Sequence, residues 1–380
     1  MQPHEFPRRV LVCVTGMTPQ VLTETLYSLA VRRKPAFVPT EVHAISTAEG
    51  IERARLMLLS KDKSQFANLM RDYSLPEISL SAGSLHVIRD PENRPLSDIR
   101  TPEDNASAAD AITALLADLT ADADAAIHVS IAGGRKTMGY YLGYALSLFG
   151  RPQDRLSHVL VSPEFESLPE FFYPSPRETI LMDRSGKPLD ASTARVDLAE
   201  IPFVRLRDDL PAEMLVATRF ADVVAAASRV REPPKLRVLL SERAIECSGA
   251  RVELSPQAFA FYAWLAERCW DETEVGGLVK PTEFNDPEST LRMGLVELGD
   301  RLFQNEFASG YDQWLQWDPQ DFGDKNNEWV YQRYHDINRR LQDALGKHAA
   351  AVFQVQSVPV GGKRRGYSLA LTPEQIEIVQ

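Results

Sequence analysis

The stretch Arg9-Val10-Leu11-Val12-Cys13-Val14-Thr15-Gly16-Met17-Thr18-Pro19-Gln20 decides the fold. Its first six residues form a mostly apolar run with the length of one buried strand, and a loop with glycine and proline follows. Apolar residues then recur at helical spacing over residues 21–31. The stretch therefore predicts one strand–loop–helix unit.

The same unit recurs through the first 205 residues. Further strands are predicted at residues 41–46, 85–88, 125–131 and 158–161, and further helices at 48–59, 102–119 and 137–149. Such alternation is typical of a mainly parallel sheet with helices on both faces. The fold class predicted for this part is α/β and Rossmann-like. Ligands bind such sheets beyond the carboxyl ends of the strands.

A second loop, Gly133-Gly134-Arg135-Lys136, follows the strand predicted at 125–131 and opens the next helix. The glycines allow close backbone approach, and a helix N-terminus attracts anions. A lysine in the first helical turn is unfavourable with the helix dipole, so a bound anion would explain Lys136. The spacing matches neither a Walker A loop nor the dinucleotide fingerprint, which disfavours ATP hydrolysis and NAD chemistry. The two loops together predict a nucleotide site.

Both loops also have a purely structural interpretation. Gly133 and Gly134 could form only a tight turn, with Lys136 in solvent. Thr15 or Thr18 could serve only to cap the helix that follows.

Composition limits the class of protein. A chain of 380 residues suits two domains, and 44% hydrophobic and 25% charged residues are ordinary for a folded globular protein. The apolar runs are too short to cross a bilayer, and the N-terminus lacks a signal pattern. Three cysteines without paired spacing indicate neither a disulfide framework nor a zinc site. We expect a cytoplasmic protein without a metal, a cofactor or a membrane partner.

The C-terminal part predicts a smaller α+β domain. Residues 206–234 are expected to be a helical linker, with a helix at 211–230, and residues 235–380 the second domain. Strands are predicted at 236–240, 244–247, 251–254, 353–358 and 366–371, and helices at 257–269 and 328–345. Helix, strand, basic turn and strand follow one another at the end, which is the order of a winged helix.

Basic residues are concentrated in two places of this predicted winged helix. The candidate DNA-binding residues are Arg339 and Arg340 on the helix, and Lys363, Arg364 and Arg365 in the turn. Residues 235–380 nevertheless hold 16 Lys and Arg against 22 Asp and Glu, and the net charge of the chain is −11. Contact with DNA would have to be local. Docking of a protein or dimerisation through this domain stays open.

The segments Cys13–Val21 and Ser130–Met138 resemble the two signatures of CRISPR-associated Rossmann-fold (CARF) sensor proteins, specifically the ring-nuclease branch. The resemblance covers residues 8–205. It implies a homodimer that binds a cyclic oligoadenylate, with cyclic tetra-adenylate favoured, and cuts it without a metal. The catalytic lysine of the family falls on Lys136, and its hydroxyl residue on Thr15 or Thr18. The implied ligand-binding residues are Gly16, Met17, Gln20, Gly133, Gly134, Arg135 and Thr137.

Two functions follow from this resemblance. In the first, the ribose 2′-OH of the ligand attacks the adjacent phosphorus and leaves a 2′,3′-cyclic phosphate. In the second, the protein senses the messenger without cutting it and regulates transcription through the winged helix. The segment Leu254-Ser255-Pro256 and the ending Lys363–Leu369 are similar to output domains of bacterial response regulators. An effector that cuts bulk RNA is disfavoured, because neither His335 nor His348 has an arginine five residues upstream.

Overall fold

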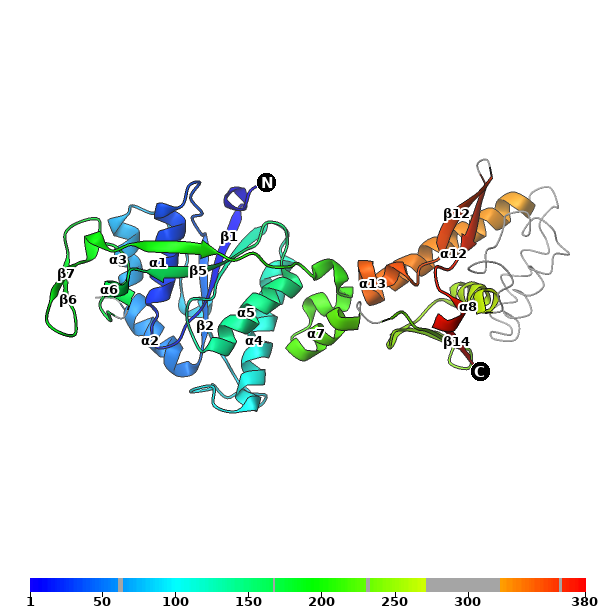
Figure 1. Ribbon diagram of the computed structural model, residues 1–380, viewed down its shortest axis with the longest axis horizontal. Coiled ribbons are helices and arrows are strands. Elements are labelled where there is room, and N and C mark those ends of the chain that lie inside the picture. Colours follow the sequence, from blue (N-terminus) through cyan, green and yellow to red (C-terminus); the bar gives the residue numbers. More distant parts are fainter. Residues whose placement is uncertain (61–63, 167, 230–232, 271–321, 362–363) are drawn as a thin grey trace. The chain divides into compact units, whose positions relative to one another are not determined.

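The computed structural model describes residues 1–60, 64–166, 168–229, 233–270, 322–361 and 364–380. The chain forms two compact units (Figure 1). The first consists of residues 1–207 and 215–224, and the second of residues 208–214 and 225–380. Residues 206–234, which the sequence predicts as a linker, are divided between the two units.

A six-stranded sheet in the order β3-β2-β1-β4-β5-β8 forms the centre of the first unit. Its strands are β1 (Arg8–Val14), β2 (Glu41–Ser46), β3 (Leu85–Val87), β4 (Ala125–Ser130), β5 (Arg155–Val161) and β8 (Val196–Glu200). All neighbours are parallel except β5 and β8. The predicted α/β class with a mainly parallel sheet is therefore confirmed.

Helices cover both faces of this sheet (Figure 1). One face carries α1 (Gln20–Tyr27), α2 (Ala48–Leu58) and α3 (Gln65–Asp72), and the other carries α4 (Pro102–Ala121) and α5 (Lys136–Phe149). The start of α4 illustrates how local sequence fixes the first residue of a helix. Thr101 and Asp104 form a capping box, and Pro102 fills the first helical position.

Some elements differ from the prediction. The helix predicted at 211–230 is instead a 3-10 turn, Ala212–Val216, and the later helix α7 (Phe220–Arg229). The reason is tertiary: the ring of Phe220 packs on Tyr141 and Tyr144, and its N–H donates to Asp110. The sequence prediction also omitted α3, α6 (Pro163–Glu166), β8, and the hairpin of β6 (Ile180–Met182) and β7 (Pro188–Asp190).

The second unit contains a sheet in the order β11-β10-β9-β14 and a separate hairpin. Its strands are β9 (Leu236–Leu239), β10 (Ala244–Cys247), β11 (Ala250–Val252), β12 (Gln356–Gly361), β13 (Arg364–Ser368) and β14 (Ile376–Val379). Its helices are α8 (Pro256–Trp270), α12 (Phe322–Leu345) and α13 (Lys347–Ala351). The core gathers around α8, where every side chain from Ala258 to Ala266 is buried.

The hairpin of β12 and β13 differs from the prediction in where its first strand begins. Strand β12 begins at Gln356, not at residue 353, because Phe353 and Val355 are buried in the core of the unit and do not pair. Helix α13 and strand β14 were not predicted either. Strand β14 runs parallel to β9 and forms one edge of the four-stranded sheet.

Candidate functional site

The candidate site lies where the strand order reverses. Strands β1 and β4 are neighbours, but the chain continues from β1 outward to β2 and from β4 outward to β5. The loops that follow β1 and β4 therefore leave the sheet in opposite directions and open a crevice at its carboxyl edge. The two loops predicted from sequence, residues 15–20 and 133–136, both lie at this position. Their last residues, Gln20 and Lys136, are already the first residues of α1 and α5.

The two loops touch through their backbones, and two glycines make this contact possible. A Cβ atom on Gly16 would lie 3.4 Å from the Cα of Gly134. A Cβ atom on Gly133 would lie only 2.6 Å from the carbonyl oxygen of Val14 and 3.2 Å from the Cα of Thr15. Gly134 has φ +74°, which L side chains rarely adopt. The second loop therefore has no room for a larger residue at Gly133, whereas a Cβ atom on Gly16 would make only an ordinary contact.

The two threonines of the first loop have different environments. Thr15 is fully buried, and its hydroxyl donates to the carbonyl of Thr18 at 3.5 Å. The hydroxyl of Ser46 donates to the carbonyl of Thr15 and so holds the loop against β2. Thr18 and Met17 are exposed. Thr15 is therefore part of the internal structure of the loop, whereas Thr18 is exposed on its surface.

Gln20 is buried at the start of α1, and its amide donates to the carbonyl of Pro169 at 2.9 Å. The hydroxyl of Thr23 likewise donates to the carbonyl of Phe172 at 2.7 Å. Both side chains fasten the segment after α6 to α1. A direct contact between Gln20 and a ligand would require this segment to move.

The second loop presents cations at the N-terminus of α5. Lys136 and Thr137 are exposed in its first turn, and the first N–H groups of a helix have no intrahelical acceptor. The ammonium group of Lys136 forms no ion pair with any residue that the structure describes. Free N–H groups and an unneutralised lysine together favour an anion at this point.

Arg135 is held by Asp98, which sequence reasoning missed. The guanidinium donates to both carboxylate oxygens of Asp98, through Nε at 3.0 Å and through Nη2. These bonds, with others from Ile99 and Arg100, lower the pKa of Asp98 to about 2. Asp98 follows β3 at the same edge of the sheet as the loops. Its position after a predicted strand is the only signal that the sequence offered.

Gly50 was also missed. It lies in the first turn of α2, where a Cβ atom would overlap the side chain of Ser46 and lie 3.2 Å from the carbonyl oxygen of Gly16. Its absence of a side chain lets α2 approach the first loop. The sequence signal was a glycine inside a predicted helix.

Glu24 is a buried carboxyl group one turn after Gln20. Burial, and secondly the charge of Glu166, raise its pKa to about 8. In the unfolded chain the pKa of this carboxyl is near 4.5. Between about pH 4.5 and pH 8 the folded protein therefore keeps a proton that the unfolded chain has lost. The free energy of unfolding falls as pH rises through this range, by at most about 1.4 kcal/mol per pH unit.

We therefore predict that Glu24→Gln stabilises the protein more at pH 8 than at pH 5, by on the order of 3 kcal/mol. Urea unfolding of the wild-type protein and of Glu24→Gln between pH 5 and pH 8 measures the difference in their free energies of unfolding. The contributions of other titrating groups are common to both proteins and cancel in this difference. Glu49→Gln supplies the matched control, because it removes an exposed carboxylate by the same substitution. A pH-independent effect of Glu24→Gln would contradict the prediction.

The candidate DNA-binding residues are only partly placed. Arg339 and Arg340 both bind the carboxylate of Asp336, at 2.9 and 3.3 Å. Arg365 is exposed on β13, and its guanidinium donates to Ser357. Lys363 lies outside the described residues, as does the side chain of Arg364. Part of the positive charge on α12 is thus neutralised within the helix.

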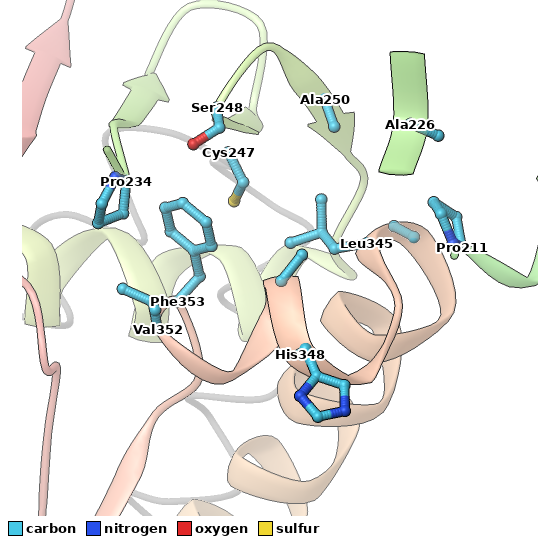
Figure 2. A pocket seen from close by; sticks show the side chains of 12 residues that line it. Pro211, Ala226, Pro234, Cys247, Ser248, Ala250, Leu345, His348, Val352 and Phe353 are labelled. Carbon is cyan, nitrogen blue, oxygen red and sulfur yellow. The ribbon is translucent and has the colours of Figure 1, made fainter. Parts of the chain in front are cut away.

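A cavity of about 90 Å³ lies within the second unit (Figure 2). Its walls are largely apolar, with Pro211, Leu345 and Phe353 among them, and the polar side chains shown in Figure 2 are Cys247, Ser248 and His348. Burial raises the pKa of the Cys247 thiol far above its ordinary value. A protonated, buried thiol is a poor nucleophile, so this cavity offers little chemistry.

None of the helices that the structure describes is both long and apolar enough to cross a membrane. Among all the described residues, no cluster of three or more His, Cys, Asp or Glu side chains is arranged to hold a metal ion.

The sheet order and the paired loops define a Rossmann-like α/β protein with its candidate site at the switch point. Comparison with protein families identifies it further. The family described as CRISPR-associated protein NE0113 (Cas_NE0113) matches residues 18–232, more than half of the chain. The chain therefore belongs to this family of CRISPR-associated proteins. No curated protein matches it significantly.

Proposed function

We propose that the protein is a ring nuclease that binds cyclic tetra-adenylate and opens it without a metal ion. The observation that carries the proposal is the backbone contact between the loops that follow β1 and β4. Beside this contact Lys136 is exposed, and it forms no ion pair within the residues that the structure describes. Membership of a CRISPR-associated family supports it as well, because cyclic oligoadenylates are messengers of type III CRISPR systems.

The proposed ligand is shared by two copies of the chain. Met17 and Tyr140 are exposed at 59% and 60%, although both are large apolar residues. Met17 lies in the first loop, and Tyr140 lies one helical turn after Lys136. A two-fold dimer through this surface would bury both residues and present two identical loop pairs to opposite phosphates of a four-membered ring.

The proposed reaction uses the ligand's own nucleophile. The ribose 2′-oxygen forms a bond to phosphorus, the bond from phosphorus to the 5′-oxygen breaks, and the 2′-OH proton ends on the 5′-oxygen. The ammonium group of Lys136 and the N–H groups at the start of α5 stabilise the charge on the phosphorane. Thr18, which is exposed, positions the ribose or phosphate, while the buried Thr15 holds the loop. The product ends in a 2′,3′-cyclic phosphate.

Slow turnover is expected from this site. Neither loop, residues 15–20 or 131–137, contains a carboxylate or an imidazole. Alignment and charge stabilisation then act without a general base, which commonly contributes about a hundredfold or more.

The direct test incubates the purified protein with radiolabelled cyclic tetra-adenylate in EDTA. The proposal predicts linear di-adenylate with a cyclic phosphate end, separated by chromatography. Intact ligand after prolonged incubation with excess protein would refute the nuclease function.

A sensor that regulates transcription is the second candidate. The observation in its favour is the hairpin β12–β13, which follows α12 in the chain. The side chain of Arg339 on α12 is 71% exposed, and Arg365 on β13 is exposed as well. Tight binding of uncut ligand, together with DNA binding that depends on it, would support this function.

The pair of Arg135 and Asp98 gives a further prediction. Asp98→Asn removes a negative charge beside the proposed anion site and frees the guanidinium of Arg135 for the ligand. We expect affinity for cyclic tetra-adenylate to rise by about threefold to tenfold, with the larger gain at low salt. Equilibrium binding at two salt concentrations measures this. The control is Asp183→Asn, in the turn between β6 and β7, which should leave affinity unchanged. Weaker binding by Asp98→Asn would show that the ion pair orders the loop instead.

A further inference from the structure

A second cavity lies at the opposite, amino-terminal edge of the central sheet. Its volume is about 310 Å³, at the lower end of the range for small-molecule sites. Pro3 precedes β1, Pro35 and Phe37 precede β2, and Arg155 opens β5. These residues, with Arg33 and His128, line a space that the proposed ring-nuclease site does not use.

Two guanidinium groups make this cavity electropositive. Arg33 uses Nη1 for an ion pair with Glu200 at 2.5 Å. Arg155 uses Nη1 for the carbonyls of Pro152 and Asp154, at 2.7 and 2.8 Å. In both side chains Nε and Nη2 have no acceptor in the part of the chain that the structure describes. An arginine carries five N–H donors, so several remain for a ligand.

His128 provides a third polar group, and it is buried with one nitrogen unsatisfied. Its Nε2 lies 2.8 Å from the hydroxyl of Ser157, whereas Nδ1 has no partner among the described residues. Burial, then the charges of Arg33 and Arg155, lower its pKa to about 3, so the ring is neutral at pH 7. When Ser157 donates to Nε2, Nδ1 carries the proton and can donate in turn. Buried polar atoms are rarely left without a partner.

The walls between these polar groups are apolar. Phe37 lies against the ring of His128, with centroids 5.6 Å apart, and Pro3 and Pro35 add two further apolar surfaces. A few polar groups that converge in an otherwise apolar cavity are the usual pattern of a small-molecule site. Arginine pairs favour phosphate, because the planar fork donates two parallel hydrogen bonds.

We propose that this cavity binds a nucleoside monophosphate. Its phosphate is bound by Arg33 and Arg155, and its planar ring system by the apolar walls beside His128. The proposal is independent of the ring-nuclease function, since the two sites share no residue and lie at opposite edges of the sheet.

The test is calorimetric titration of the full chain with AMP, with inorganic phosphate and adenosine titrated separately. AMP should bind more tightly than either part, because only AMP occupies the arginines and the apolar walls together. Binding of AMP no tighter than that of inorganic phosphate would overturn the nucleotide assignment, and absence of AMP binding at millimolar concentration would overturn the site.

Substitutions of the arginines that line the cavity test where AMP binds. Arg33→Ala and Arg155→Ala should each weaken AMP binding by about tenfold. The matched control is Arg32→Ala, because Arg32 also pairs with a carboxylate of β8, Asp197, but does not line the cavity. Arg33→Lys keeps the charge and serves if an alanine variant fails to fold. Unchanged affinity in both pocket variants, or loss of AMP binding in Lys136→Ala, would place AMP elsewhere and overturn the proposal.

Discussion

Replacing Lys136 by alanine should reduce the rate of cyclic tetra-adenylate cleavage by about a hundredfold to a thousandfold, the range for removing one charge-stabilising group. Lys136 is exposed, forms no ion pair within the described chain, and belongs to the first turn of α5. Its positive charge matters most when the phosphorane forms. Binding should weaken by no more than about tenfold, because the N–H groups of α5 and Arg135 remain.

Single-turnover assays with protein in excess separate the rate of cleavage from affinity. Lys187→Ala is the matched control, since Lys187 is an exposed lysine of the same unit in the β6–β7 turn. It should cleave at the wild-type rate. An equal loss of cleavage rate in both variants would show that the overall electrostatic field of the protein, and not Lys136 itself, determines the rate. Full activity in Lys136→Ala would exclude this lysine from the proposed mechanism.

Gly133→Ala should reduce the rate of cleavage by about a hundredfold or more and weaken ligand binding as well. The new Cβ atom would lie 2.6 Å from the carbonyl oxygen of Val14, and 3.0 Å from the side chain of Val21. Backbone must shift to relieve this contact, because a carbonyl oxygen at the end of a central strand cannot rotate away. A displacement of about 1 Å at a reacting group commonly costs about a hundredfold in rate.

The control for Gly133→Ala is Gly143→Ala, ten residues later in α5. Its Cβ atom would meet only a side-chain carbon of Leu156, at an ordinary 3.7 Å. Alanine should instead stabilise the helix, by roughly 0.5–1 kcal/mol, and leave cleavage unchanged. Circular dichroism and binding assays on both variants compare them. Normal binding by a folded Gly133→Ala protein would show that the loop contact does not shape the ligand site.

The sequence predicted those parts of the fold that carry local signals. Strand β2 and the start of α4 were placed correctly, because an apolar run and a proline with a capping box mark them. Helix α3 was missed although its apolar residues recur at helical spacing, because its eight residues make only about two turns and only Phe66 and Leu69 are buried. Strand β8 was missed because its position depends on pairing with β5 and not on its own alternation.

The candidate site was predictable to a similar extent. Glycines and basic residues mark the second loop directly in the sequence. The environment of Thr15 was not predictable, because its carbonyl accepts a hydrogen bond from Ser46 of β2, which lies 31 positions further along the chain. The pairing of Arg135 with Asp98 likewise joins residues 37 positions apart. Such contacts arise only when several loops meet at one edge of the sheet.

The central placement of β1 and β4 has a consequence for heat denaturation. The outer strands β3 and β8 have a single neighbour each and can fray at temperatures below the main transition. The loops that follow β1 and β4 continue from two middle strands, so they should persist until the whole sheet melts. A ligand held there would raise the main melting temperature and not that of an earlier, partial transition.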